Sequence, residues 1–254
     1  MTALVRALWA EQLKLRGTLA LWMCVVAPAL VVGVYVLQIT FSKFPARLEG
    51  ADAAMAWQAL VQSTLVLWAF LMLPLLVTLQ AALLAGLEHQ GQHWKHLLAL
   101  APPRHVHYLA KLLALLAMLA LSHAAMFALV PLGGAVLMLA KPAFGLAGAP
   151  PWATLASTLA TIFGATVLLA ALHTWIAIRW RSFAVAVGVG MGATVMGFLI
   201  GQSARFGPWY PWSLPLQVLA EDPHVAGRVL ALSLAGGVVA TLAGLAWFRR
   251  IEAA

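Results

Sequence analysis

Histidine is the residue type in this chain whose spacing comes nearest to a chemical site. Five of the eight histidines lie close together, at His89, His93, His96, His105 and His107. On a helix, the first three fall at i, i+4 and i+7, and imidazole nitrogens are common zinc ligands. We favour the alternative that these are hydrated surface histidines facing a partner, with a pH-sensitive contact as a second role. We therefore predict no metal site.

A single histidine stands near the middle of a long apolar run. His123 is a candidate intramembrane polar site, because ionisable groups inside a membrane are candidates for function. The simpler interpretation, which we favour, is a neutral histidine bonded to a serine, a threonine or a backbone carbonyl. His173 lies beside Trp175 near the end of another apolar run, which indicates an anchor at the membrane interface.

Motifs for covalent chemistry are incomplete in this sequence. It contains no GxxxxGK[ST], and no glycine is followed by lysine, so the chain cannot cradle nucleotide phosphates by itself. The zinc-protease motif HExxH is also missing. Residues 201–204 (GQSA) approach the GxSG of rhomboid proteases, but Ala204 replaces the last glycine and no histidine follows in the last apolar run to act as a base. We therefore expect no catalytic residues and no enzyme activity in this chain.

The elements that position these side chains must lie in a membrane. Of the 254 residues, 64% are hydrophobic and 9% charged, whereas an ordinary soluble domain is roughly 25% charged. No basic cluster comes with a domain that could present it, so the net charge of +8 does not indicate nucleic-acid binding. We predict an all-α integral membrane protein that forms a single domain over residues 1–254. Its six transmembrane helices are expected at about 19–41, 59–85, 108–139, 153–178, 183–203 and 229–248.

Irregular features are expected at several points along these spans. Residues 1–16 carry apolar side chains near one face and cationic ones beside them, which predicts an amphipathic helix in the plane of the membrane. Pro74 should kink the second span. The third run is longer than the hydrocarbon core requires, and we expect it to break near Pro131.

Positive charges predict the orientation, because loops rich in lysine and arginine stay in the cytoplasm. With both termini inside, ten of the fifteen such residues fall on the cytoplasmic side and five outside. This places the loop between the second and third spans in the cytoplasm. The ten are Arg6, Lys14, Arg16, Lys95, Arg104, Lys111, Arg179, Arg181, Arg249 and Arg250; the five are Lys43, Arg47, Lys141, Arg205 and Arg228.

That cytoplasmic loop contains a second amphipathic helix. Trp94, Leu97, Leu98 and Ala101 recur at i, i+3, i+4 and i+7. The helix must stop at the proline pair that follows, because the residue before a proline is pushed out of the α region. A surface helix of this kind, over 90–101, is suited to dock a soluble partner.

An aromatic, proline-rich segment, 205–216 (RFGPWYPWSLPL), precedes the last span. Aromatic rings at the headgroup level anchor membrane proteins, and we favour that role. The alternative is a partly re-entrant outer gate formed by Trp209, Tyr210 and Trp212, at the point where a lipophilic substrate would leave.

The loop between the second and third spans also carries a family resemblance. Its pattern resembles the cytoplasmic loop after the second span of ATP-binding-cassette (ABC) export permeases, most closely their antibiotic-export and lantibiotic-immunity branch. Residues 102–104 (PPR) depart from the Pro-x-Ser-Arg that the family commonly shows. The matching residues are Glu88, Gly91, Trp94, Lys95, Leu97, Leu98, Leu100, Pro102, Arg104 and Lys111.

The resemblance implies a multi-pass permease subunit in the bacterial inner (cytoplasmic) membrane. A separate ATPase subunit would bind ATP and magnesium, and a second permease subunit would complete a homodimer or heterodimer. The expected cargo is a hydrophobic or amphipathic compound, such as a peptide antibiotic, a drug or a lipid, exported by alternating access and so giving multidrug or bacteriocin resistance. Coupling to the ATPase is assigned to Glu88, Trp94, Lys95, Leu97, Leu98 and Arg104.

Glu88 ranks first among the acids because an acidic residue at this position is part of the resemblance. It would cap the docking helix or pair with a basic residue of the ATPase. Two other classes of protein stay open. One is a membrane assembly or scaffold protein that transports nothing. The other is an ion-driven secondary transporter, which is disfavoured by the scarcity of acidic residues inside the spans and by the lack of evident inverted repeats.

Overall fold

The computed structural model describes residues 3–41, 52–90, 103–220 and 222–250, and all regular structure in these ranges is helical. Five helices are long and apolar enough to cross a membrane, or six if a bent pair is one span. The prediction of an all-α membrane protein is confirmed at this level. The elements are α1 (Ala3–Leu15), α2 (Leu19–Phe41), α3 (Ala53–Leu67), η1 (Trp68–Met72), α4 (Leu73–Gln90), α6 (Arg104–Ala140), η2 (Pro142–Phe144), α7 (Trp152–Ala165), α8 (Val167–Arg179), α9 (Phe183–Gly201), η3 (Gly207–Trp209), α10 (Leu214–Gln217) and α11 (Pro223–Arg250).

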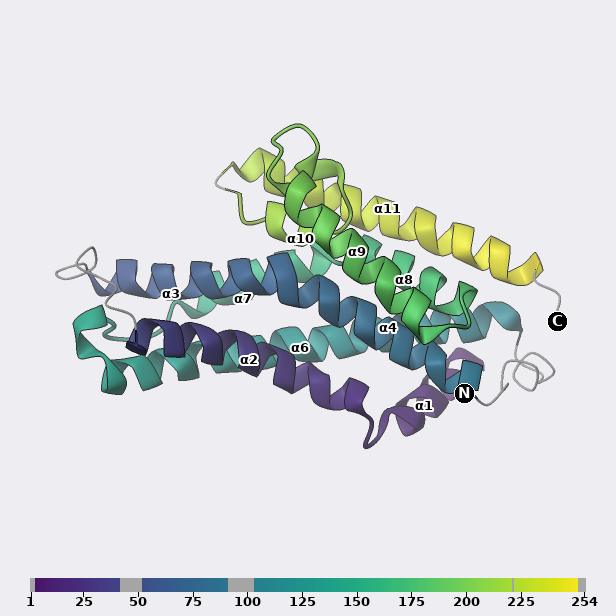
Figure 1. Cartoon of the computed structure of the whole chain (residues 1–254), viewed down its shortest axis with the longest axis horizontal. Helices are drawn as coiled ribbons and strands as arrows, with labels where there is room; N and C mark the ends of the chain where they lie inside the picture. Colours follow the sequence, from purple (N-terminus) through teal and green to yellow (C-terminus); the bar gives the residue numbers. More distant parts are fainter. Residues whose placement is uncertain (1–2, 42–51, 91–102, 221, 251–254) are drawn as a thin grey trace.

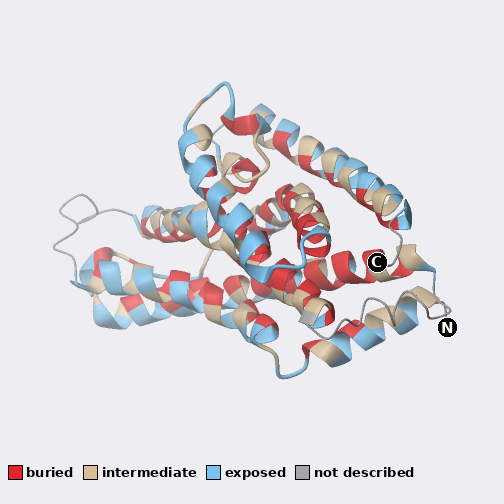
Figure 2. Ribbon diagram, turned by 45° about the vertical axis from the view of Figure 1, so that its right-hand side comes forward, coloured by how far each residue is buried: buried red, intermediate tan, exposed pale blue. Residues whose placement is uncertain are grey.

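The helices form an elongated bundle (Figure 1). Helix α6 packs along α2, and α8 packs along both α4 and α11. Buried residues gather along α4, α6 and α8, whereas α9 and α11 turn many exposed residues outward (Figure 2). Much of that exposed surface is apolar and includes Trp22, Val195 and Leu242. A large exposed apolar surface indicates contact with a membrane.

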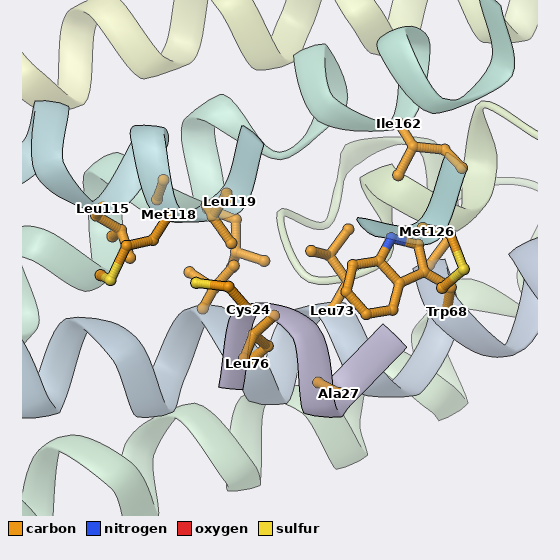
Figure 3. Packing of buried hydrophobic residues seen from close by; sticks show 14 of the residues in the cluster. Cys24, Ala27, Trp68, Leu73, Leu76, Leu115, Met118, Leu119, Met126 and Ile162 are labelled. Carbon is orange, nitrogen blue, oxygen red and sulfur yellow. The ribbon is translucent and has the colours of Figure 1, made fainter. Parts of the chain in front are cut away.

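The main core lies between α2, η1, α4, α6, α7 and α8, and Figure 3 shows part of it. Trp68, Leu115 and Met126 are among its largest buried side chains. Lipid tails are as apolar as leucine, so the removal of these side chains from lipid gains little. Close packing and the dispersion contacts that it brings therefore hold the core together.

A π-helical turn lies just before Pro74, the residue expected to kink the second span. This turn, η1, ends two residues before the proline and joins α3 to α4 in one candidate span, 53–89. Proline has no N–H, so the carbonyl of Phe70, four residues earlier, lacks its usual helical donor. A π turn changes the hydrogen-bond register at this point, and such turns are frequent at functional sites.

The third span is one unbroken helix, α6, and the predicted break near Pro131 is wrong. A Cβ on Gly133 would lie 2.6 Å from Cγ1 of Val32, and a Cβ on Gly134 would overlap the ring of Trp57. The glycines therefore serve the close approach of α2 and α3 to α6. With 37 residues, α6 is about 55 Å long at ~1.5 Å per residue, so it must tilt or protrude from a hydrocarbon core of roughly 30 Å.

The break lies instead in the fourth span, which the sequence predicts as continuous. Helices α7 and α8 meet at Thr166 with a bend of 40°. Ser233 of α11 lies at this bend; its hydroxyl donates to the Gly164 carbonyl (3.0 Å) and accepts from the Leu168 N–H (3.2 Å). In an unbroken helix these two backbone groups would bond to each other. The serine has entered the helical ladder, which is a known cause of bends.

Two helices begin earlier than predicted. The second span is expected from about residue 59, but α3 begins at Ala53 with alanines that favour helix. The last span is expected from about residue 229, but α11 begins at Pro223, a residue favoured at the first helical position. Asp222 supports this start because its Oδ1 accepts from the His224 N–H (2.8 Å).

Candidate functional site

Four charged side chains meet at one end of the bundle. Glu11 and Lys14 come from α1, Glu88 from the last turns of α4, and Lys111 from α6. The Lys111 ammonium donates to Glu88 (2.6 Å) and Glu11 (3.2 Å), and that of Lys14 donates to Glu88 (2.6 Å) and Glu11 (2.9 Å). We call these four residues the ion cluster. Each carboxylate thus receives both lysines, and the formal charges of the cluster cancel.

Local sequence places each member of the ion cluster. Glu11 and Lys14 are three residues apart and so share a face of α1. Gly17 turns the chain from α1 into α2 with a φ of 74°, a left-handed conformation that glycine adopts without strain. As a result α1 lies beside the end of α4 (Figure 1). Lys111 adds a bond to the Leu84 carbonyl (3.0 Å), which fixes its ammonium against α4.

Burial determines how much free energy is lost when one member of the ion cluster is removed. The side chains of Glu88 and Lys111 are only 2% and 3% exposed, whereas that of Lys14 is 33% exposed. Burial alone would lower the pKa of Lys14, but the hydrogen bond that its ammonium donates to Glu88 and the charges of Glu11 and Glu88 outweigh it and raise that pKa. Removing one partner of a buried pair leaves a charge without compensation, which costs about 3–5 kcal/mol.

The predicted docking helix lies outside the described residues, and so do Trp94, Lys95, Leu97 and Leu98. Their role stays a prediction. Glu88 and Arg104 are described, and they stand at the two ends of that gap: Glu88 in α4 and Arg104 as the first residue of α6. The carboxylate of Glu88 is bonded to Lys14 and Lys111 of its own chain, and these partners were not predicted.

The histidines of this region are only partly described. His89 Nε2 lies 3.0 Å from the Ala177 carbonyl, so it ties α4 to α8. Within the described ranges, no three His, Cys, Asp or Glu side chains come close enough to hold a metal. His93 and His96 lie outside those ranges, and the absence of a metal site therefore stays a prediction.

His123 is buried in the middle of α6. Its Nδ1 donates to the Leu119 carbonyl (2.8 Å), in agreement with the favoured interpretation of a histidine bonded to backbone. Its other nitrogen, Nε2, has no hydrogen-bond partner among the described residues, and neither does Nε1 of Trp68. The two rings meet edge to face with centroids 5.7 Å apart.

Comparison with known proteins decides the family. The family model described as ABC-2 family transporter protein matches residues 7–197, most of the chain. The chain belongs to the ABC-2 transporter family. No curated protein and no solved structure matched it. The family implies a multi-pass membrane protein that works with an ABC ATPase. Two members of the ion cluster, Glu88 and Lys111, lie on the helices before and after the loop of this ABC-2 transporter that is predicted to meet that partner.

The segment between α9 and α11 of the ABC-2 transporter reaches into the bundle. Trp212 Nε1 donates to His173 Nε2 (3.1 Å), and the Tyr210 hydroxyl donates to the Ala193 carbonyl of α9 (2.9 Å). Trp209 is exposed. His173 also lies 3.2 Å from the Thr78 hydroxyl of α4. It is fully buried, so the predicted interface anchor at His173 is wrong, and the residue instead connects this segment to α4 and α8.

The partners of Glu88 are the functional residues that sequence reasoning missed. A signal for them was present. Lys111 is a lysine in an otherwise apolar helix, and a charge in that setting requires a partner. Glu11 and Lys14 are likewise three residues apart in an apolar segment. What the sequence lacked was a way to bring residues 74 and 100 positions apart together.

Proposed function

We propose that this chain is the membrane-spanning permease subunit of an ABC exporter that moves a hydrophobic or amphipathic compound by alternating access. A separate ATPase subunit would supply the energy, and this chain would have no enzyme activity of its own. The observation that carries the proposal is the ion cluster. It joins α1 and α6 to the last turns of α4, and α4 leads into the predicted docking helix.

The ion cluster is suited to transmit movement. Its members belong to three helices, and breaking any buried pair would leave a charge away from water. The three helix ends should therefore move together as one body when the docking loop is displaced. A rigid-body shift of packed helices is one of the common forms of a switching transition. In this proposal Glu88 acts through Lys14 and Lys111 of its own chain.

Hydroxyl groups inside the bundle support a lipophilic cargo. Six buried serine and threonine hydroxyls donate to the carbonyl four residues earlier in their own helix, so they offer no hydrogen to a passing molecule. A pathway between such helices presents mainly apolar side chains. The six are Thr64, Thr78, Ser122, Thr166, Thr174 and Thr194.

We place the ion cluster on the cytoplasmic side of a bacterial inner membrane, with both termini in the cytoplasm. The start of α1 and the end of α11 lie at the same end of the bundle (Figure 1). Val5, Trp9 and Leu13 form an exposed apolar stripe on α1, while Glu11 faces inward. This arrangement is expected for a helix that lies on the membrane surface. A second permease subunit, identical or related, would complete the transporter, as the family resemblance implies.

The first test separates docking from transmission. The tagged chain is purified from its native membranes and scored for bound ATPase subunit and for vanadate-sensitive ATP hydrolysis. The Trp94→Ala, Leu98→Ala variant should lose the ATPase. The Glu88→Leu, Lys111→Leu variant should keep the ATPase bound, because an apolar pair can replace a buried ion pair in stability. It should lose most of the hydrolysis, because the leucines make no ion pairs with Glu11 and Lys14 of α1.

A matched variant controls for the loss of two opposite charges. Asp52→Leu, Arg228→Leu removes one acid and one base from exposed positions, and the Asp52 side chain makes no capping hydrogen bond to α3. It should retain both the ATPase and its hydrolysis. If no ATPase co-purifies with the wild-type chain, the exporter proposal is wrong, and the scaffold and ion-driven alternatives would return.

A further inference from the structure

Two buried polar atoms near the middle of the bundle lack partners and lie on neighbouring rings. They are Trp68 Nε1 and His123 Nε2, and neither has a hydrogen-bond partner in the part of the chain that the structure describes. Trp68 is fully buried and His123 is 6% exposed. Polar atoms left unpaired in a membrane interior cost free energy, and their retention calls for an explanation.

The two atoms are complementary in chemistry. An indole N–H only donates. The Nδ1 of His123 donates to the Leu119 carbonyl, so in the neutral ring Nε2 accepts. A ligand that joins them must therefore accept from one and donate to the other. The two rings meet edge to face with centroids 5.7 Å apart, so a single small polar group is the size of ligand that suits this pair.

The surroundings of this pair are irregular on both sides. Trp68 begins the π turn η1. Phe163 packs edge to face on His123 with centroids 5.6 Å apart and lies three residues before the bend at Thr166. A π turn and a bend are places where a helix can change shape without breaking many hydrogen bonds. Movement of either element would open a route to the two nitrogens.

We propose that Trp68 and His123 together bind the hydroxyl group of a lipophilic alcohol. The indole N–H donates to the hydroxyl oxygen, and the hydroxyl hydrogen is donated to His123 Nε2. This inference rests on the proposed function and narrows its cargo to apolar molecules with an alcohol group. An ether satisfies only the indole, and a hydrocarbon satisfies neither atom.

The test uses three probes of similar length: 1-dodecanol, 1-methoxydodecane and dodecane. The thermal midpoint Tm of the purified chain in lipid nanodiscs is measured with each probe. The alcohol should raise Tm by roughly 2–4 °C, the ether by less, and dodecane by no more than its general effect on the bilayer. Trp68→Phe and His123→Phe should each abolish the advantage of the alcohol, while the exposed controls Trp22→Phe and His224→Phe should retain it.

A second measurement needs no variant. In ¹⁵N spectra of the wild-type chain labelled at tryptophan and histidine, the alcohol should shift the Trp68 Nε1 and His123 Nε2 signals together. Equal Tm with alcohol and hydrocarbon, or an advantage that persists in both variants, would overturn the proposal. So would ¹⁵N signals that already have hydrogen-bonded values without alcohol, since a permanently bound water would then fill the role. None of these readouts depends on an ATPase, so this inference and the exporter proposal can fail separately.

Discussion

The ion cluster and the Trp68–His123 pair differ in whether their buried polar atoms have hydrogen-bond partners. In the ion cluster each lysine nitrogen reaches both carboxylates, and Lys111 adds a backbone carbonyl. In the pair, one nitrogen of each ring has no partner among the described residues. Both regions are buried, so burial alone does not explain the difference.

Charge explains it. An unpaired ion away from water costs far more than an unpaired neutral donor or acceptor. Charged side chains must therefore be paired in every state of the protein, which makes them suited to hold helices together. Neutral atoms can be left unpaired in one state and satisfied by a ligand in another. We infer that the end of the bundle is built for permanent connection and its middle for transient binding.

The largest effect should come from breaking the ion cluster. Lys111→Met should lower the free energy of unfolding by about 3–5 kcal/mol, because it removes the cation from the buried side of the two carboxylates, where water cannot replace it. Titration with a denaturing detergent in mixed micelles measures this change. A loss below about 1 kcal/mol would mean that water reaches Glu88 and that the cluster is not a fixed connection.

Lys14→Met is the matched control within the same cluster. Its side chain makes the same two ion pairs, but it is 33% exposed, whereas that of Lys111 is 3% exposed. Water can replace much of what Lys14 provides, so we expect a loss of about 1 kcal/mol. Equal losses for the two lysines would contradict the assignment of the effect to burial.

Much of the fold could be predicted from the sequence. The first span agrees with α2 at both ends. The kink at Pro74 stays a prediction, although a π turn ends two residues before that proline. Hydropathy and proline act locally, within the segment that carries them, and this is why they could be used. The same reasoning failed for α6, because its glycines allow the close approach of Val32 and Trp57, which lie on other helices.

The candidate site was predictable only in part. Glu88 was identified, but its partners lie on helices that approach it through the fold. The bend at Thr166 was missed for the same reason, since Ser233, the residue responsible for it, belongs to α11. In each case the missing information was a contact between distant segments, and a single sequence does not contain it. The docking residues 94–98 lie outside the described part of the chain, so their assignment stays a prediction.

The bend offers an intermediate case, a neutral group that is fully paired. Ser233→Ala removes both hydrogen bonds to the interrupted ladder and should cost about 1–3 kcal/mol, because the Gly164 carbonyl and the Leu168 N–H lose their partner. The same detergent titration applies. Ser157→Ala removes an exposed hydroxyl that bonds only to Thr154, and it should change stability by less than about 0.5 kcal/mol. If Ser233→Ala leaves the free energy of unfolding unchanged, α7 and α8 can rejoin into a straight helix.

The smallest effect should come from the segment between α9 and α11. Trp212→Phe removes the donor to His173 Nε2 but leaves the Thr78 hydroxyl 3.2 Å from the same nitrogen. That hydroxyl already donates its single hydrogen to the Pro74 carbonyl, so it can serve only one of the two acceptors. One hydrogen bond is lost in either case, and the expected loss is about 1 kcal/mol. Trp209→Phe, at an exposed ring, is the control and should be nearly neutral. If Trp212→Phe lowers the free energy of unfolding as much as Lys111→Met, neutral hydrogen bonds here stabilise the fold as strongly as ion pairs. The distinction between permanent and transient contacts would then fail.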